Sequence, residues 1–399
     1  MGGRNFVYLG DGWALSAFHV GPQTVDPPEV QTLALEFSTG SFNLIKGQNF
    51  TVRNPAGSGL TEFTDLRLVR LNGDPGLPSI FDANPQFTIA SQPVTTSTPL
   101  SQREVLFVGR GPTRNANQTH WNVTTVGGDD NDIWTEVTTG GTRHGYKATH
   151  PSDDTKRWGT NQIADEDPIF PGTDTDLRGT VQYSLGVGLR DVVSMVTKFD
   201  AQGSGGLTNE FQAVPGDSGS AVFYKRDNQW ELIGIVNGQY STYDNQPGPF
   251  SSPAALSTAV YGNYTLFADL SYYRGEILNI INAHKEYSII GDVNLDGVVS
   301  GNGLGPSATD DVTAFAAGWM YQQAVGDVTS WKKGDLNLDG ITNVDDFFLL
   351  RDALQSAGAG AGITSLGDIL GGGAGVPEPS ALFLAMLGAG LLAGRRRRR

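Results

Sequence analysis

Short β-type segments separated by glycine-rich turns constrain this chain more than any other feature of its sequence. Its 399 residues include 53 glycines and 20 prolines, a content that favours a turn-rich β protein over a helical bundle. The length suggests two or three units rather than a single domain. We therefore expect a mainly β fold with flexible joints between its parts.

Charge and cysteine content exclude several classes of function. The formal net charge is -15 at pH 7, and five of the 27 basic residues form the terminal run 395–399, so the rest of the chain is more acidic still. Such a surface repels nucleic acid, and we expect no polyanionic partner. The chain has no cysteine. Disulfides, thiolate catalysis and cysteine-ligated zinc are therefore excluded.

A Gly-Asp-Ser-Gly turn at residues 216–219 stands between the segment 211–215 and the strand-like segment 221–224. A serine hydroxyl is a poor nucleophile, so a protein that uses one holds it on a tight turn beside a base and beside donors for the oxyanion. The glycines at 216 and 219 permit such a turn. By itself this tetrapeptide is more often an ordinary loop, and its meaning depends on the rest of the chain.

Two earlier segments place a histidine and an aspartate at the ends of strand-like runs. Residues 6–20 read as two short β segments around a Gly-Asp-Gly turn, and the second segment leads to His19. In residues 63–71, spaced leucines mark a strand with a partly buried face, and Asp65 stands at its entrance. Each residue alone has an ordinary structural interpretation, as a packed histidine and as a turn-capping carboxylate.

The three motifs, in the order His, Asp, Ser, resemble those of trypsin-like serine proteases. In that family a Gly-Trp-(small)-Leu strand leads to the catalytic histidine; here Phe18 stands where alanine is usual. The resemblance covers roughly residues 6–286 and implies a fold of two six-stranded antiparallel β-barrels. It also implies that Ser218 is the nucleophile, that His19 is the general base, and that Asp65 orients the imidazole.

The same resemblance implies an oxyanion hole and a substrate pocket. The backbone N–H groups of Gly216 and Ser218 would stabilise the developing oxyanion. Gln212 takes the position at the base of the primary pocket where proteases that cut after Lys or Arg carry an aspartate. Asn237 and Gly238 stand where the family has its Ser-Trp-Gly wall. We therefore expect a protein or peptide substrate with an uncharged side chain at the cleavage point.

The protease-like region, residues 1–287, contains one expansion and one shortfall. Residues 112–178 are polar and predict enlarged loops in the second barrel. They contain three histidines whose spacing matches no zinc motif, so structural roles are favoured over a metal site. These histidines are His120, His144 and His150. His19 arrives early and no apolar leader precedes it, so we expect that first-barrel strands and a signal peptide are missing from a chain that starts late.

An acidic hexapeptide occurs twice, at residues 292–297 and 335–340. Oxygen ligands on alternate residues, followed by a glycine, are what a Ca²⁺ loop requires. The ligands expected in the first copy are Asp292, Asn294, Asp296, Val298, Ser300 and Asp311. Those expected in the second copy are Asp335, Asn337, Asp339, the carbonyl of Ile341, Asn343 and Asp346. In the first copy, residues 301–308 look inserted, which separates the last ligand from the others.

The paired loops resemble a dockerin module, whose loops end in aspartate where EF-hands use glutamate. The resemblance implies a small α-helical domain over residues 288–355, with calcium as its cofactor and a cohesin-like protein as its partner. Catalysis itself would require no cofactor. The alternative is that both copies are acidic turns that bind no metal.

A Gly/Ala-rich linker at residues 356–375 leads to a tail at 376–399, which combines Pro-Glu-Pro, an apolar run at 381–393 and five arginines. The apolar run is shorter than the ~20 residues that span a bilayer comfortably, and the arginines favour a cytoplasmic end. The tail resembles the PEP-CTERM sorting signal. This resemblance implies an exosortase-type processing enzyme, transient anchoring by the C-terminal helix, and export to the cell surface or medium.

Two functions stay open at this point. The first is an exported serine endopeptidase that is tethered or sorted to the cell surface. The second is a catalytically inactive, protease-like scaffold whose dockerin-like module mediates protein binding. Convergence of His19, Asp65 and Ser218 within hydrogen-bonding reach would favour the first.

Overall fold

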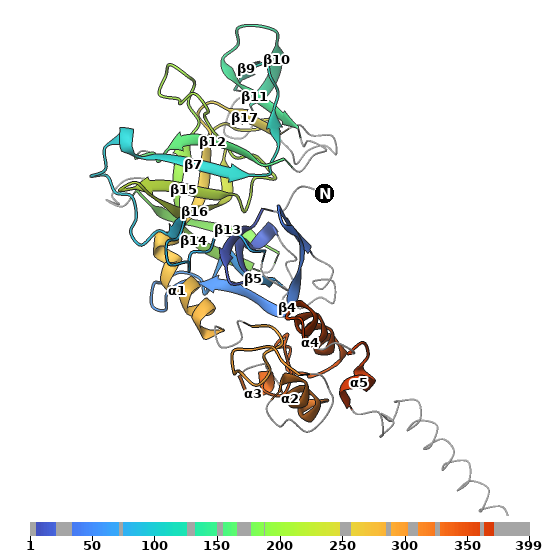
Figure 1. The fold of residues 1–399 in the computed structure, drawn as a ribbon. Coiled ribbons are helices and arrows are strands. Elements are labelled where there is room, and N and C mark those ends of the chain that lie inside the picture. Colours follow the sequence, from blue (N-terminus) through green and yellow to red (C-terminus); the bar gives the residue numbers. More distant parts are fainter. Residues whose placement is uncertain are drawn as a thin grey trace, which may run out of the picture. The chain divides into compact units, whose positions relative to one another are not determined.

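The computed structural model of the chain comprises two compact units, residues 1–288 and 289–399. It describes residues 5–20, 34–71, 75–125, 132–149, 155–165, 177–186, 188–247, 257–284, 289–301, 310–323, 328–359 and 363–370. The first unit is built mostly from antiparallel sheets, and the second from short helices and loops (Figure 1). The predicted mainly β fold is therefore confirmed. The predicted C-terminal apolar helix lies outside the described residues.

The elements carry the labels of Figure 1. The first unit contains β1 (Val7–Gly10), β2 (Trp13–Ala17), η1 (Phe18–Val20), β3 (Ala34–Phe37), β4 (Gly40–Arg53), β5 (Phe63–Leu71), β6 (Phe87–Ile89), η3 (Leu100–Gln102), β7 (Glu104–Gly109), β8 (Thr113–Arg114), β9 (Thr119–Thr124), β10 (Ile133–Val137), β11 (Arg143–Thr149), β12 (Arg157–Gln162), β13 (Gly179–Leu185), β14 (Gly188–Lys198), β15 (Ala221–Arg226), β16 (Gln229–Tyr240), β17 (Ser257–Val260), β18 (Tyr264–Asp269) and α1 (Leu270–Ala283). The second unit contains α2 (Asp311–Gly318), α3 (Val328–Trp331), α4 (Val344–Ser356) and α5 (Leu366–Leu370).

A five-stranded sheet, in the order β1-β2-β5-β4-β3, positions two of the predicted site residues. β1 and β2 form a hairpin around residues 10–12, whose positive φ angles suit the Gly-Asp-Gly turn. β2 is buried along its length and pairs antiparallel with β5, with Ala17 opposite Leu66. Because His19 and Asp65 each lie within two residues of that pair, the register brings them together.

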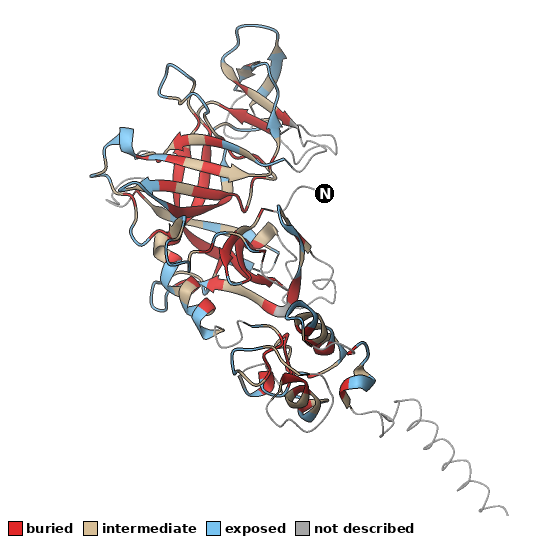
Figure 2. Ribbon diagram, in the orientation of Figure 1, coloured by how far each residue is buried: buried red, intermediate tan, exposed pale blue. Residues whose placement is uncertain are grey.

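An eight-stranded sheet positions Ser218, which lies in the loop before β15. Its main path runs β12-β7-β15-β16-β18-β14-β13, and β6 pairs with β16. The end of β12 returns to β14 through a bridge between Ile163 and Thr197 and a 3.0 Å hydrogen bond from the Ala164 N–H to the Val196 carbonyl. The strands from β12 to β14 therefore curl around a buried apolar core, which is coloured red in Figure 2.

Residues 112–178, predicted as enlarged loops, contain ordered strands. β8, β9, β10 and β11 join β17 in a further five-stranded sheet. Trp121 on β9 is 2% exposed, and its ring lies edge-on to that of Trp134 at 5.9 Å. Aromatic cross-strand contacts stabilise strands even where the composition is polar, and a search for alternating apolar residues misses them. The two predicted six-stranded barrels stay a prediction.

Candidate active site

Asp65 holds both the ring and the backbone of His19. The His19 Nδ1 lies 2.7 Å from Asp65 Oδ2, and the His19 backbone N–H donates to Asp65 Oδ1 at 3.0 Å. The carboxylate is fully buried, whereas 26% of the His19 side chain is exposed. A neutral ring that donates its Nδ1–H to a carboxylate keeps its lone pair on Nε2. The pair therefore presents an oriented base to the solvent side.

Ser218 lies on a turn that requires glycine on either side. Gly216 has a φ of 108° and Gly219 a φ of 84°, values that side chains rarely allow. Ser218 and His19 line the same cavity. No hydrogen bond joins their side chains among the described residues, so the expected hydrogen-bonding convergence is seen for His19 and Asp65 but not for Ser218. Hydrogen bonds between a base and a nucleophile are often long without bound substrate.

The backbone of this turn leaves two N–H groups available. The N–H groups of Asp217, Gly219 and Ser220 donate to backbone carbonyls at 2.7 to 3.0 Å. Within the described part of the chain, the N–H groups of Gly216 and Ser218 have no acceptor. A pair of free donors beside a serine hydroxyl is the arrangement that stabilises an oxyanion.

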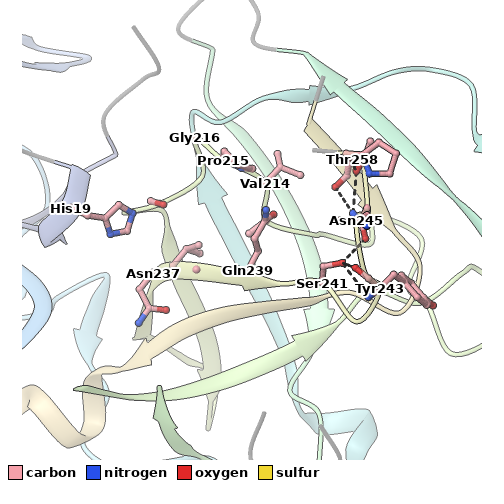
Figure 3. Close-up of a pocket in the computed structure, with 16 residues that line it drawn as sticks. His19, Val214, Pro215, Gly216, Asn237, Gln239, Ser241, Tyr243, Asn245 and Thr258 are labelled. Atoms are coloured by element: carbon pink, nitrogen blue, oxygen red, sulfur yellow. Dashed lines mark hydrogen bonds between the residues drawn. The ribbon is translucent and has the colours of Figure 1, made fainter. Parts of the chain in front are cut away.

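The cavity beside His19 and Ser218 has a volume of about 940 Å³. In Figure 3, His19 lies at one end of the lining and Tyr243 and Thr258 at the other. Apart from the His19 imidazole and the Tyr243 phenol, no titratable side chain of the described residues lines it, and it has no carboxylate, lysine or arginine. The rest of its polar lining consists of amide and hydroxyl side chains: Ser218, Asn237, Gln239, Ser241, Tyr243, Asn245, Gln246 and Thr258. The cavity is therefore suited to an uncharged guest.

The predicted pocket residues do not all reach this cavity. Asn237 and Gly238 line it, but Gln212 does not. The Gln212 Nε2 donates to the backbone carbonyls of Ala213 and Tyr264 at 3.0 and 3.1 Å. Gln212 lines a neighbouring cavity of about 440 Å³ instead. These hydrogen bonds to the backbone hold the Gln212 amide away from the cavity at whose base it was predicted to lie.

Phe18, where the chain departs from the protease pattern, has two guanidinium groups close to its ring. The Cζ atoms of Arg190 and Arg67 lie 3.8 and 4.3 Å from its ring centre. Arg190 also donates to the backbone carbonyl just before Asp65, at 2.7 Å. Burial lowers the pKa of Arg190, and the nearby Asp65 carboxylate opposes that shift. The stack therefore ties the segment of His19 to the segment of its orienting carboxylate.

Asp217, next to the candidate nucleophile, is a buried carboxylate that points away from the cavity of Ser218. It is 6% exposed, and its Oδ2 accepts the Val214 N–H at 2.9 Å. Burial raises its pKa to about 7, although that hydrogen bond and the charge of Arg157 oppose the shift. The side chain lines the smaller, 440 Å³ cavity. It therefore acts on the turn's stability rather than on the substrate.

Two of the three histidines of residues 112–178 meet on the sheet formed by β8 to β11 and β17. The Nδ1 atoms of His120 and His144 lie 2.7 Å apart, so one of them donates and the other accepts. His150 lies outside the described residues. Across the described ranges, no group of three or more His, Asp or Glu side chains is arranged to hold a metal ion. A structural hydrogen bond accounts for this histidine pair.

The two acidic loops have the same internal hydrogen bonds. Asp346 accepts three backbone N–H groups of its own loop at 2.8 to 3.1 Å. Asp311 accepts the three corresponding N–H groups of the first loop at 2.6 to 3.1 Å. Despite the longer spacing in the first copy, Asp311 thus occupies the place that Asp346 has in the second.

The backbone twist of the loops is also shared. The φ angles of Leu295 and Leu338 are 63° and 59°, and those of Gly297 and Gly340 are 88° and 86°. Other expected ligands make local hydrogen bonds. The side chains of Asn294 and Asn337 accept the N–H groups of Asp296 and Asp339, and Asn343 is the N-cap of α4. The remaining expected ligands in these loops are Asp292, Asp296, Val298, Ser300, Asp335, Asp339 and Ile341.

The second loop concentrates uncompensated negative charge. Asp335 is fully buried, and its Oδ1 has no hydrogen-bond partner among the described residues. Burial raises the pKa of Asp335, and the charge of Asp339 raises it further. Burial likewise raises the pKa of Asp346 to about 8, with contributions from both of those carboxylates. Oxygen donors of this kind fit a hard cation such as Ca²⁺.

Three residues that bear on the site carry no signal in the sequence. Arg67 and Arg190 stand in strand patterns, where an arginine ordinarily reads as part of a solvated face. Asn5 is a single amide before the first strand. Their roles depend on residues more than 40 positions away in the chain, as the hydrogen bonds and ring contacts show.

Comparison with known families identifies the end of the chain. Residues 375–399 match the PEP-CTERM protein-sorting motif. This motif directs export and cell-surface sorting and is recognised by exosortase-type processing enzymes, so the predicted sorting signal is confirmed. The comparison with curated proteins finds no match. Among the described residues, no helix combines the length and apolar character needed to cross a membrane.

Proposed function

We propose that this protein is an exported serine endopeptidase, with Ser218 as nucleophile, His19 as general base and Asp65 as the residue that orients the base. One observation carries the proposal. His19, which is hydrogen-bonded to the buried Asp65 carboxylate, lines the same cavity as Ser218, whose turn has two free N–H donors. Few other functions require a base, a nucleophile and oxyanion donors around one cavity.

The proposed reaction has two half-steps. Ser218 Oγ attacks the peptide carbonyl carbon while its proton passes to His19 Nε2, and the carbonyl oxygen becomes an oxyanion between the two free N–H groups. The C–N bond then breaks, and Nε2 returns the proton to the leaving amine. Water attacks the resulting ester with His19 again as base, which releases the acid and regenerates the serine. Asp65 stabilises the imidazolium in both half-steps.

The lining of the cavity defines the expected substrate. Amide and hydroxyl groups hydrogen-bond with uncharged polar side chains, whereas no carboxylate of the described lining residues could pair with a Lys or Arg side chain. Burying an unpaired charge is costly. We therefore expect peptide bonds that follow uncharged residues to be cleaved.

A fluorophosphonate probe tests the proposal, because it labels only activated serines. The wild-type chain should be labelled at Ser218, and Ser218→Ala should not. Ser220→Ala is a matched control: this serine lies in the same turn but is 1% exposed, and its removal should leave labelling intact. Equal labelling of wild type and Ser218→Ala would refute the proposal and favour the non-catalytic scaffold.

We further propose that residues 288–355 form a calcium-binding, dockerin-like module with a cohesin-like protein partner. The orphaned Asp335 Oδ1 and the mutual repulsion of the carboxylates around it support this assignment. Asp335, Asn337, Asp339 and Asp346 would hold the ion in the second loop, where it would neutralise their charge. The three carboxylates are not arranged around one point in this structure, so binding would have to draw them together.

Thermal unfolding of the full chain tests the module. Calcium should raise the midpoint of the second unit's transition, and a chelator should reverse the effect, because an ion that binds only the folded state stabilises it. Magnesium at equal concentration serves as control, since it prefers six-coordinate sites with several waters. A transition unchanged by chelator would count against the assignment.

A further inference from the structure

Asn5 places one buried amide against the turn of the candidate nucleophile. Its Nδ2 donates to the carbonyl of Gly216 at 3.0 Å and to the carbonyl of Ser218 at 3.1 Å. Its Oδ1 accepts the Arg110 N–H at 2.7 Å, which fixes which end of the amide faces the turn. The residue is 4% exposed. A single side chain thus holds two alternate carbonyls of one short loop.

These contacts complete a pattern of locked peptide planes. The plane between residues 216 and 217 is held at its carbonyl by Asn5 and at its N–H by Val214. The plane between residues 218 and 219 is held at its carbonyl by Asn5 and at its N–H by Val236. The planes next to these carry the free N–H groups of Gly216 and Ser218. The plane of the Ser218 N–H has a locked plane on each side, and the plane of the Gly216 N–H has one after it. Rotation of either plane is therefore restricted at a Cα atom that it shares with a locked plane.

Asn5 packs closely against two glycines, one of them in the turn. A Cβ on Gly219 would come within 2.3 Å of the Asn5 carbonyl oxygen, and a Cβ on Gly109 within 3.4 Å of its Oδ1. The same Asn5 carbonyl accepts a hydrogen bond from Ser16 Oγ on β2. The backbone of Asn5 is therefore hydrogen-bonded to β2, the strand that leads to His19, while its side chain is hydrogen-bonded to the turn of Ser218.

The geometry points to Asn5 as a positioning residue that holds the two oxyanion donors in place, an inference that rests on the proposed peptidase function. It touches neither substrate nor reacting atoms. It acts by preventing rotation of the peptide planes that would turn the free N–H groups away from the cavity. Preorganised donors stabilise the transition state because they need no reorientation when charge develops.

Two substitutions remove the clamp in different ways. Asn5→Ala deletes both hydrogen bonds to the turn. Asn5→Asp keeps the shape but places a carboxylate oxygen against two carbonyl oxygens, so it repels the turn instead of holding it. Loss of one oxyanion donor costs roughly 100- to 1,000-fold in kcat, and a donor that is misdirected rather than deleted should cost less. We expect Asn5→Ala to lower the rate about 10- to 100-fold, and Asn5→Asp to lower it further.

The readouts are the rate of fluorophosphonate labelling at Ser218 and the steady-state hydrolysis of p-nitrophenyl acetate. An interaction made only in the transition state lowers kcat and leaves KM nearly unchanged. Asn54→Ala is the matched control. Asn54 is also buried, and its Nδ2 also donates to two backbone carbonyls, of Thr61 and Asp191, but it lies outside the active site. That variant should lose stability but keep its rates when folded.

All variants are compared at a temperature where circular dichroism shows them folded, and Asn5→Ser replaces Asn5→Ala if the latter does not fold. A folded Asn5 variant with wild-type labelling and kcat overturns the inference while the peptidase proposal stands. A slowed Asn5 variant whose KM rises with unchanged kcat also overturns it. A wild-type chain that is not labelled at all overturns the peptidase proposal, and the inference with it.

Discussion

Replacing Phe18 tests whether the two arginines close to its ring stabilise the segments of His19 and Asp65. The ring is 3% exposed, and Arg67 and Arg190, which lie over it, are 2% and 7% exposed. Phe18→Leu retains most of the apolar volume but removes the π face that the guanidinium groups contact. The effect of this substitution therefore reports mainly on the two cation–π contacts.

The expected magnitude follows from burial. A cation–π contact contributes about 0.5–1 kcal/mol at exposed sites and about 2 kcal/mol where it is desolvated. Both guanidinium groups over Phe18 are buried, so Phe18→Leu should lower the free energy of unfolding by about 2–4 kcal/mol. Phe18→Ala adds a cavity and should cost at least the ~3–5 kcal/mol of an ordinary core Phe→Ala change. The free energy of unfolding of a domain is only about 5–15 kcal/mol, so the alanine variant approaches the limit of folding.

Urea unfolding followed by circular dichroism measures these losses, with Phe267→Leu as control. Phe267 is fully buried in the same unit, and no cation lies over its ring among the described residues. The Phe18→Leu transition should fall at lower urea than that of Phe267→Leu, and the folded fraction should react more slowly with fluorophosphonate. If both leucine variants unfold at the same urea concentration, the stack contributes nothing beyond packing, and this reasoning is refuted.

Three further outcomes are expected. Burial raises the pKa of Asp217 from 3.8 to about 7. Its contribution to the free energy of unfolding is therefore largest below pH ~4 and is lost as the pH rises towards 7. The urea midpoint of Asp217→Asn should lack that decline, and parallel plots of midpoint against pH for the variant and the wild type would contradict this prediction. Asp346→Asn should reduce the calcium-induced rise in melting temperature, and an unchanged rise would exclude Asp346 as a ligand. Deletion of residues 376–399 should abolish surface sorting in cell fractionation while fluorophosphonate still labels Ser218; retention at the surface would contradict it.

Local sequence patterns were sufficient for elements whose physics is local. The positive φ angles at residues 10–12, 297 and 340 occur at glycines or at a Gly-Asp-Gly turn, which the sequence marks directly. The duplicated loops share one backbone twist because they share one hexapeptide pattern. The sorting motif at 375–399 is recognised from composition and order alone, without a fold.

Contacts between distant segments could not be predicted in this way. Strands β8 to β11 are stabilised by aromatic and polar cross-strand pairs, and their sequence has no regular alternation of apolar residues that would predict them. Gln212 does not line the cavity of Ser218, because its amide donates hydrogen bonds to two backbone carbonyls elsewhere. Asp311 was separated from its loop by the longer spacing, yet its carboxylate meets the same three N–H groups as Asp346.

The sequence by itself determined the mainly β class and the sorting tail, and it supplied the paired acidic loops and the proposed nucleophile, base and orienting carboxylate as predictions. Only the tertiary structure decided which side chains meet. The pairing of β2 with β5 joins His19 to Asp65, and the amide of Asn5 reaches a turn more than 200 residues later. The physical reason is that turns and motifs arise from neighbouring residues, whereas the direction of an N–H donor or the burial of an arginine depends on strands that meet only in the fold.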